Sequence, residues 1–142
     1  MADLKERIFE MGKDLQLINF ATLTLEGRPW VRYVVGKADK DLLFRFCTHK
    51  ETRKVGQIRK NPQVHLSLGA ATLETADHWL QVEGTAEIST AKAERESFWF
   101  DELKNYFSGP EDPNYCIVIV RPSSIEFGTM GGMEPEVWKP GK

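Results

Sequence analysis

A chain of 142 residues is long enough for one ordinary domain and too short for two of usual size. Hydrophobic residues make up 41% and charged residues 28%, a balance that indicates a folded globular protein and excludes a disordered chain. The formal net charge of −2 argues against a duplex-binding protein, which needs a positive excess, so no nucleic-acid partner is expected.

The first half of the sequence predicts a helix, a meander of three strands and a second, short helix. Four apolar residues recur at helical spacing near the start and predict an amphipathic helix over residues 3–14. Apolar and β-branched runs separated by turn residues predict strands over residues 17–25, 30–36 and 42–48. Residues 51–60 carry only two apolar positions at helical spacing, which predicts a short surface helix.

The second half predicts three strands, of which the last is apolar on both faces and is therefore expected to be central. The expected segments are a strand at 64–68, a loop at 70–77, a strand at 80–88, a helix at 91–107, a strand at 115–127 and an irregular tail at 128–142. About six strands joined mostly by turns favour an antiparallel β-barrel over a parallel sheet. The predicted fold is one α+β domain spanning 1–142, mostly β, built on six antiparallel strands.

The cysteines and the chain start point to the cytoplasm. Cys47 and Cys116 lie in apolar strand-like runs, as buried free thiols in a reducing compartment do. The N-terminal residues lack the apolar stretch of a signal peptide, and no apolar run approaches the ~20 residues that span a bilayer. The three histidines have no metal-ligand spacing, so neither a membrane partner nor a metal site is expected.

The start of the second predicted helix is the most informative stretch for function. Thr52, Arg53 and Lys54 open this helix directly after a strand that ends at Thr48. Free N–H groups at a helix N-terminus, a hydroxyl, a guanidinium and an ammonium together suit a phosphate dianion. A solvated basic helix face on an otherwise acidic protein is the alternative interpretation.

Residues 52–68 resemble the signature of the pyridoxamine 5′-phosphate oxidases and related split-barrel flavoproteins, in which a Ser/Thr-Arg-Lys triplet opens a short helix ending in Asn-Pro. Three further segments resemble the same family in consistent order. These are Phe46-Cys-Thr48, Arg32-Tyr-Val-Val-Gly-Lys37 and Val82-Glu-Gly-Thr-Ala-Glu87. The resemblance spans roughly residues 15–127 and implies a split β-barrel.

The resemblance also implies flavin mononucleotide (FMN) as the cofactor, in clefts between the subunits of a homodimer. Arg53 and Lys54 would bind the FMN phosphate, and Thr52 or Thr48 would add a hydroxyl. The remaining implied positions lie on neighbouring strands. Arg32 and Lys37 would lie at the phosphate or the polar edge of the ring, and the backbone of Val34 and Val35 would face the ring. Cys47 lies at the strand end that touches the flavin, and Trp79 stands where vitamin oxidases carry a Gln that binds it.

Departures from the family pattern argue against a true pyridoxamine phosphate oxidase. Gly128 replaces a Trp, and the C-terminal Arg-Leu-His-x-Arg segment that holds the vitamin substrate is absent. The short chain is more similar to the general stress protein branch. The tail offers two weaker signals: the segment Gly128-Thr-Met-Gly-Gly132 lacks the context of a phosphate loop, and Trp138 is either an aromatic lid over the flavin or a residue at the dimer seam.

Four functions remain open from the sequence. The first is an FMN-dependent oxidoreductase that passes electrons from a reduced nicotinamide to a small acceptor, without an identifiable catalytic residue. The second is a non-catalytic flavin-binding stress protein. The third is haem or deazaflavin binding on the same barrel, and the fourth is single-stranded nucleic-acid binding, which the charge balance disfavours.

Overall fold

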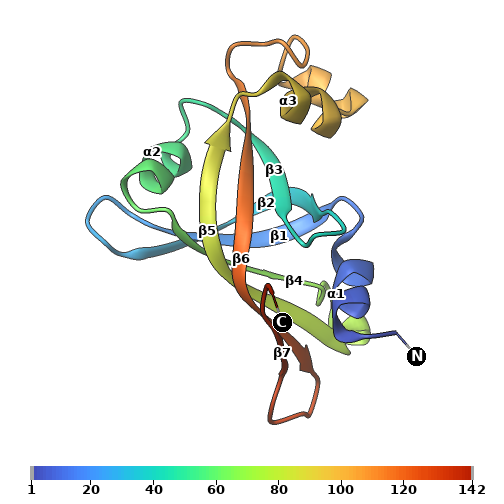
Figure 1. Cartoon of the computed structure of the whole chain (residues 1–142). Helices are drawn as coiled ribbons and strands as arrows, with labels where there is room; N and C mark the ends of the chain where they lie inside the picture. The colour runs from blue at the N-terminus through green and yellow to red at the C-terminus, as the bar shows by residue number, and fades with distance from the viewer. Residues whose placement is uncertain (1, 142) are drawn as a thin grey trace.

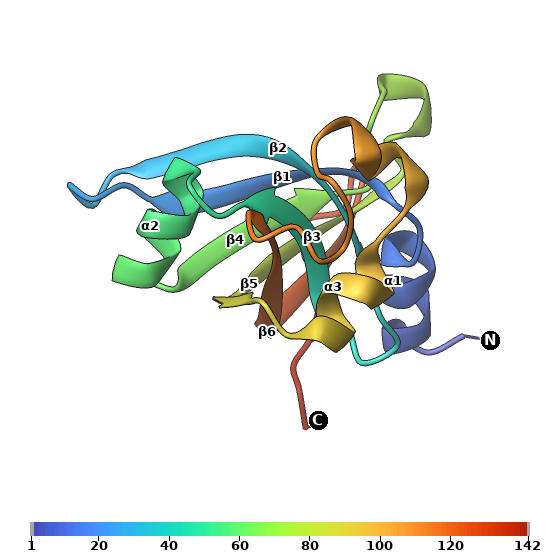
Figure 2. The ribbon, with the colours of Figure 1, turned by 90° about the horizontal axis from the view of Figure 1, so that it is seen from above.

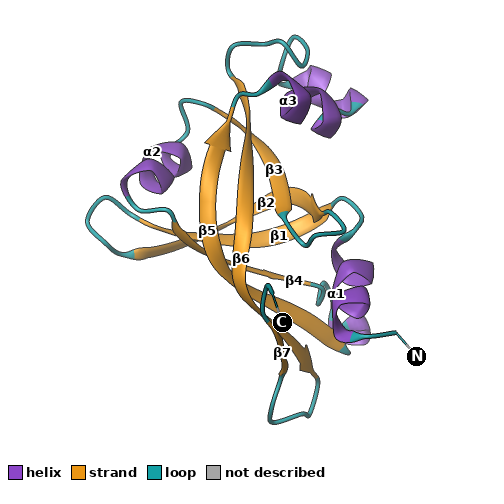
Figure 3. Ribbon diagram, in the orientation of Figure 1, coloured by secondary structure: helices purple, strands orange, loops and turns teal. Residues whose placement is uncertain are grey.

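The computed structural model of the chain describes residues 2–141, and shows a β-barrel with helices around its outside (Figures 1 and 3). The helices are α1 (Leu4–Gly12), α2 (Arg53–Lys60) and α3 (Lys92–Phe98), with two 3-10 helices, η1 (Leu73–Thr75) and η2 (Asp101–Asn105). The strands are β1 (Gln16–Leu23), β2 (Pro29–Ala38), β3 (Phe44–His49), β4 (Gln63–Leu68), β5 (His78–Ser89), β6 (Tyr115–Thr129) and β7 (Glu136–Trp138).

The strands form one antiparallel sheet in the order β3-β2-β1-β4-β5-β6-β7. An additional pairing between β3 and β6 closes the six strands β1 to β6 into a barrel, while β7 pairs only with β6. The predicted six-stranded antiparallel barrel and its opening three-strand meander are therefore confirmed. Closure is the usual solution for a small all-antiparallel sheet, although β2 pairs with β3 only from Gly36 to Ala38.

Alternation along the strands sends every second side chain into the barrel. Ile18, Phe20, Leu66 and Leu80 are at most 1% exposed and belong to one continuous core, in which the Phe20 and Phe46 rings meet edge to face at 4.7 Å. The alternation of apolar and polar residues, with a period of two, is the pattern from which the positions of these strands were predicted.

Strand β6 is buried on both faces, as its sequence predicts. Its inward residues, such as Val118, belong to the main core, and Ile117 and Ile119 on the other face belong to a second apolar cluster. Phe98 from α3 and Leu103 from η2 cover that second face. The segment from α3 to η2 is thereby held against the outside of β6.

The prediction of one helix over residues 91–107 is wrong. Helix α3 ends at Phe98, because Trp99 takes a non-helical conformation (φ −60°, ψ 137°), and the chain resumes as η2. Consecutive residues of a helix point about 100° apart, so one continuous helix could not aim Phe98, Trp99 and Phe100 at the same surface. The break lets all three pack on the second cluster, where Trp99 meets Tyr115 edge to face at 5.3 Å.

Two smaller predictions also fail. The third strand begins at Phe44 and not at residue 42, because Leu42 adopts a left-handed conformation (φ 64°) in a turn that Asp39 stabilises through the N–H groups of Asp41 and Leu43. The tail is not wholly irregular, because β7 pairs with β6 across a hairpin turn that includes Gly131 (φ 81°).

The hairpin turn and Trp138 have local structural roles. The segment Gly128–Gly132 ends β6 and turns the chain toward β7. Trp138 packs against the main core of its own chain, opposite Ile125 on β6. Trp138 lies far along β6 from Thr48. Its partner Ile125 is nine residues from Cys116, which pairs with Thr48, and nine residues span up to about 30 Å along a strand.

Helix α2 is tied to the β1–β2 hairpin. Seen from above, these two strands run side by side and their turn projects beyond the barrel next to α2 (Figure 2). The Lys60 ammonium donates to the Leu25 carbonyl in this turn at 2.6 Å. No helix within residues 2–141 is long and apolar enough to cross a membrane.

Candidate functional site

The candidate site begins where α2 follows β3. Thr52 is the N-cap of α2, but its hydroxyl donates to the His49 carbonyl at 2.9 Å and makes no capping hydrogen bond to the helix. The first N–H groups of α2 are therefore left without a side-chain cap. Such a helix start favours an anion, through free donors and the positive end of the helix dipole.

Two hydroxyls and an ammonium meet at this helix start. The Lys54 Nζ donates to Thr48 Oγ1 at 3.0 Å, and Thr48 Oγ1 lies 3.0 Å from Thr52 Oγ1. The structure thus brings together three of the side chains that the sequence assigned to a phosphate. They are placed locally, because one strand end and one helix start carry all of them.

Arg32 reaches the same region from β2, beneath α2. Its guanidinium donates to the Phe20 carbonyl at 3.2 Å, to Thr22 Oγ1 at 2.9 Å and to Gln57 Oε1 at 2.9 Å. Thr22 is 3% exposed and Gln57 7%, and the Thr22 hydroxyl donates to Gln57 Oε1 at 2.6 Å. This buried polar pair fixes the direction of the Arg32 side chain.

The five residues Arg32, Thr48, Thr52, Arg53 and Lys54 are called the cation cluster below. Burial lowers the pKa of Lys54, and the neighbouring Arg32 lowers it further. Burial also lowers the pKa of Arg32, with a second contribution from Arg53. Both shifts show that the structure penalises these positive charges and that the cations repel one another.

No carboxylate relieves this repulsion. Among residues 2–141, none of the ion pairs includes Arg32, Arg53 or Lys54, and the hydrogen-bond partners of Arg32 and Lys54 are neutral. Half-buried cations usually acquire an anionic partner, because an unpaired charge is costly away from water. The residues present therefore fit a phosphate group, which would supply the missing negative charge.

The barrel opens beside the cation cluster. Strands β2 and β3 pair only from Gly36 to Ala38, whereas β2 continues to pair with β1 as far as Pro29. The edge of β2 that would continue the ladder to β3 is therefore unpaired at Val34 and Val35 within the described chain. Backbone N–H and C=O groups on such an edge are available to a heteroaromatic ring.

An apolar cavity of about 440 Å³ lies where the two strands part. The residues that line it, called the aromatic cavity below, are Val35, Cys47, His49, Phe100, Glu102, Leu103, Tyr106 and Phe107. Burial raises the pKa of the Cys47 thiol to about 11, so it stays protonated at neutral pH. Both cysteines are free thiols, and β3–β6 pairing puts Cys47 and Cys116 on opposite faces of the sheet.

Two predicted site residues lie away from the cation cluster. Lys37 lines a different cavity of about 530 Å³, together with Lys13, Lys40 and Arg45. Trp79 lies on the outer face of β5 and lines a third cavity of about 600 Å³. Within one chain, neither side chain joins the groups that meet at the start of α2.

Trp79 and Gly128 are structurally linked. They face one another in the β5–β6 ladder, and a Cβ atom at Gly128 would come within 2.5 Å of the Trp79 indole nitrogen. The indole therefore occupies the space that a side chain at position 128 would need. The two departures from the family pattern are therefore in direct contact.

Sequence reasoning missed two parts of the site. Thr22 and Gln57 were not assigned, although a polar Thr22 at an inward strand position is a visible signal that a partner lies inside the barrel. Phe100 and Tyr106 were also missed, because their position depends on the break after α3. Within residues 2–141, no group of three or more His, Cys, Asp or Glu side chains is arranged to hold a metal ion.

Comparison with known proteins places these features in context. Residues 4–128 match a family model described as "Pyridoxamine 5′-phosphate oxidase". The chain is 29% identical over 133 residues to General stress protein 26 of Bacillus subtilis (strain 168), covering 94% of each chain. The crystal structure of General Stress Protein 26 from Bacillus anthracis str. Sterne is similar, with 25% identity, a TM-score of 0.83, and coverage of 96% of this chain and 98% of that one.

More distant structures share the fold alone. A heme binding protein from Mycobacterium smegmatis is 16% identical with a TM-score of 0.72, over 95% of this chain and 56% of that one. A structure named F420 reductase is 23% identical with a TM-score of 0.63, over 88% of this chain and 98% of that one. The same barrel thus occurs in proteins named for different cofactors.

Proposed function

The chain belongs to the pyridoxamine 5′-phosphate oxidase family, and from this we propose that it is an FMN-binding flavoprotein that acts as an oxidoreductase. The observation that carries the proposal is the cation cluster, in which two half-buried cations have only neutral partners. Bound FMN would accept a hydride from a reduced nicotinamide and pass electrons to a small acceptor. The protein is proposed to differ from a true pyridoxamine phosphate oxidase.

In this proposal the residues of the cation cluster hold the cofactor phosphate. Lys54 and Arg53 neutralise it, and Arg32 adds positive charge from beneath. Thr52 or Thr48 adds a hydroxyl hydrogen bond once its proton turns to the phosphate from its partner within the chain, the His49 carbonyl for Thr52 and Thr52 Oγ1 for Thr48. The unpaired edge of β2 at Val34 and Val35 offers backbone hydrogen bonds to the polar edge of the ring, and Cys47 supplies an apolar contact. None of these groups needs to gain or lose a proton, because they bind and orient.

We also propose that two copies of the chain form the complete site. Leu17, Val31, Tyr33 and Val35 lie on the outer face of the β1–β2 hairpin, with Leu17 and Tyr33 64% and 71% exposed. An apolar face of this kind is typical of an interface. Lys37 and Trp79, which lie away from the cation cluster, would then contribute from other sides of the cleft. Both cysteines are free thiols, which suits the cytoplasm as the proposed location.

The absorbance spectrum of the purified protein, followed by mass spectrometry of the released ligand, tests the cofactor. A flavin spectrum with the mass of FMN is expected. A Soret band would show that haem is bound in place of FMN, and a deazaflavin mass would show that a deazaflavin is bound. Oxidation of a reduced nicotinamide with added acceptors then separates an enzyme from a flavin store. A bound flavin that stays oxidised favours the non-catalytic stress protein.

A fluorescence titration with FMN tests the site itself. The variant Arg53→Ala/Lys54→Ala should bind FMN at least about tenfold more weakly, because each charge-assisted hydrogen bond contributes roughly 1.5–3 kcal/mol. The exposed Lys40→Ala/Lys50→Ala variant carries the same change in net charge and serves as the control. Equal FMN affinity of the two variants would show that the phosphate does not bind at the cation cluster.

A further inference from the structure

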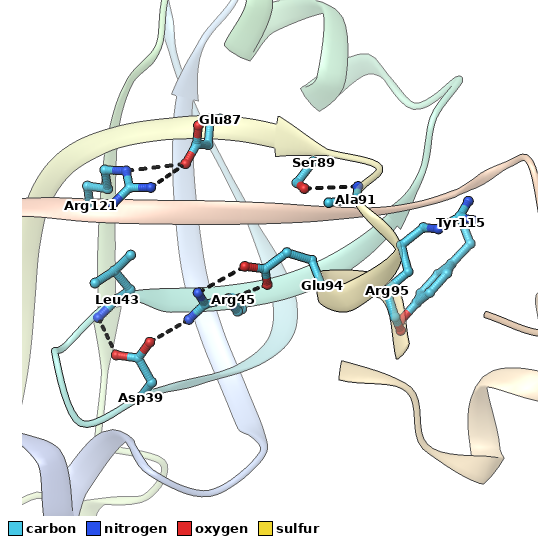
Figure 4. Close-up of polar contacts among 10 residues, drawn as sticks. All are labelled: Asp39, Leu43, Arg45, Glu87, Ser89, Ala91, Glu94, Arg95, Tyr115 and Arg121. Carbon is cyan, nitrogen blue, oxygen red and sulfur yellow. Dashed lines mark hydrogen bonds and ion pairs between the residues drawn. The ribbon is translucent and has the colours of Figure 1, made fainter. Parts of the chain in front are cut away.

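The barrel strands of the described chain contain three arginines, one each in β2, β3 and β6. Arg45 on β3 pairs with two carboxylates, Glu94 at 2.7 Å and Asp39 at 2.6 Å (Figure 4). Arg121 on β6 pairs with Glu87 at 2.8 Å (Figure 4). The third arginine, which lies on β2 and belongs to the cation cluster, forms no ion pair with any carboxylate of the described chain.

Arg32 and Arg45 are both half-buried, yet their pKa values move in opposite directions. The hydrogen bond to Glu94 is the main cause that raises the pKa of Arg45, whereas burial is the main cause that lowers the pKa of Arg32. Carboxylates therefore compensate the burial of one arginine, and no acidic side chain of the described chain does so for the other. Arg32 is built into the barrel as a cation without a counter-charge.

The amide of Gln57 takes the place of a carboxylate beside Arg32. Gln57 Oε1 accepts from Arg32 Nη2 at 2.9 Å and from the Thr22 hydroxyl at 2.6 Å. The same hydroxyl oxygen accepts from Arg32 Nη1 at 2.9 Å. Because a guanidinium only donates, the amide has to present its oxygen to Arg32. Both partners are buried, so this triangle of hydrogen bonds holds the guanidinium in one place without neutralising it.

The triangle leaves hydrogen-bond donors of Arg32 unused. A guanidinium has five N–H groups, and Arg32 uses three of them, two on Nη1 and one on Nη2. The Nε–H is not sealed off, because Arg95 Nε is the one buried side-chain nitrogen or oxygen without a partner in the described chain. Arginine typically binds phosphate through two such N–H groups at once. The anchor thus leaves both charge and donors for a phosphate.

A carboxylate at position 57 would be the simpler way to hold Arg32. Glutamate has nearly the shape of glutamine, and its oxygens accept the same hydrogen bonds. However, a buried carboxylate would form an ion pair with Arg32 and cancel its charge. The choice of an amide keeps three cations in the cation cluster, Arg32, Arg53 and Lys54, available to balance a doubly negative phosphate.

We propose that Gln57 and Thr22 are positioning residues that hold Arg32 as an uncompensated cation, and that the amide at position 57 thereby makes the site selective for a ligand with a phosphate dianion. This inference rests on the proposed function for the identity of the ligand, FMN. The two residues act through Arg32 and do not themselves contact the phosphate. Riboflavin, which has the same ring but no phosphate, does not use the charge that they preserve.

Fluorescence titration of Gln57→Glu with FMN and with riboflavin tests the role of the amide. FMN affinity should fall at least about tenfold, because the new carboxylate neutralises Arg32 and so removes a charge-assisted bond. Riboflavin affinity should stay within about twofold, and so should both affinities of the control Gln63→Glu, which makes the same change at an exposed position of β4. Unchanged FMN affinity in Gln57→Glu, or equal losses for both flavins, would overturn the proposal.

A pair of variants at Thr22 tests the positioning without a change of charge. Thr22→Val keeps the shape but removes the hydroxyl, so FMN affinity should fall about fivefold and riboflavin affinity less than about twofold. Thr22→Ser keeps the hydroxyl and should restore FMN affinity to within about twofold of the unmodified chain. Equal FMN affinity of the valine and serine variants would show that the hydroxyl does not position Arg32, and would overturn its assignment.

The titration of Lys54 in the chain without cofactor separates this inference from the proposed function. Burial lowers the pKa of Lys54, and Arg32 lowers it further. In Gln57→Glu the new carboxylate offsets Arg32, so NMR of the Lys54 side chain should show a higher pKa, with no change in Gln63→Glu. A chain that binds neither flavin would refute the proposed function, and this rise would still support the role of Gln57. An unchanged Lys54 pKa in Gln57→Glu would overturn the inference even where the unmodified chain binds FMN.

Discussion

Replacement of Lys54 by Met separates binding from stability. Methionine keeps a long apolar stem but removes the ammonium, whose only hydrogen bond within the described chain goes to the neutral Thr48 hydroxyl at 3.0 Å. With a phosphate in place, that ammonium would make a charge-assisted bond of roughly 1.5–3 kcal/mol. The FMN dissociation constant of Lys54→Met should therefore rise about 10- to 150-fold.

The unliganded variant should be no less stable than the unmodified chain. Thr48 keeps its contact with Thr52 at 3.0 Å, and Arg32 loses a repulsive neighbour. Because the pKa of Lys54 is lowered in the folded state, the unfolded chain binds more protons between that pKa and about 10.4. The unfolding free energy of the unmodified chain should rise with pH across this window, and Lys54→Met should lack that contribution.

FMN fluorescence titration and urea unfolding at several pH values are the assays. Lys50→Met makes the same charge change on a neighbouring exposed residue, and its FMN affinity should stay within about twofold of the original. An unchanged affinity in Lys54→Met would show that no phosphate binds there. A loss of more than about 1 kcal/mol of stability in the unliganded variant would show that Lys54 is structural.

Three further predictions concern the barrel. Gly128→Ala places a Cβ 2.5 Å from the Trp79 indole nitrogen, so thermal unfolding should show a loss of stability of about 1–3 kcal/mol. Adding Trp79→Leu to the same chain should restore part of this stability, and a full loss that persists in the double variant would contradict the contact. Phe20→Ala opens the core where Phe20 is 0% exposed, and urea unfolding should show a cost of about 3–5 kcal/mol, a cost below 1 kcal/mol being incompatible with this packing. Alkylation of Cys47 by iodoacetamide, followed by mass spectrometry, should be slow at neutral pH and accelerate with a midpoint near pH 11, since burial raises the pKa of its thiol to about 11; rapid labelling at neutral pH would contradict this burial.

The elements that sequence predicted well are those whose signal is local and periodic. Alternation in β4 and β5 and the all-apolar β6 identify the barrel strands, because each inward position is decided by one face of one strand. Strand β7 has three residues and forms only by pairing with β6, so no local sequence pattern predicts it. The break at Trp99 likewise depends on where β6 lies, and helical composition alone does not report it.

The same distinction divides the site. Thr52, Arg53 and Lys54 could be assigned from sequence because a helix start and its basic triplet are contiguous. The partners of Arg32 could not be assigned, because Thr22 and Gln57 are 35 residues apart and meet only when α2 folds back over β1. The aromatic cavity is lined by β2, β3 and the segment around η2, and that segment is held in place by packing on β6, so the cavity depends on closure of the barrel.

Strand β3 explains how a charged and an apolar surface can adjoin. Phe46 and Thr48 point into the barrel, and Cys47 between them packs on the second cluster outside it. The period of two therefore assigns Thr48 to the cation cluster and Cys47 to the aromatic cavity, although they are neighbours in sequence. A shift of one residue in the pairing of β3 with β6 would exchange the faces on which these two side chains lie. The six residue pairs from Phe44–Val120 to His49–Tyr115 must therefore keep their register for the charged and the apolar surface to stay apart.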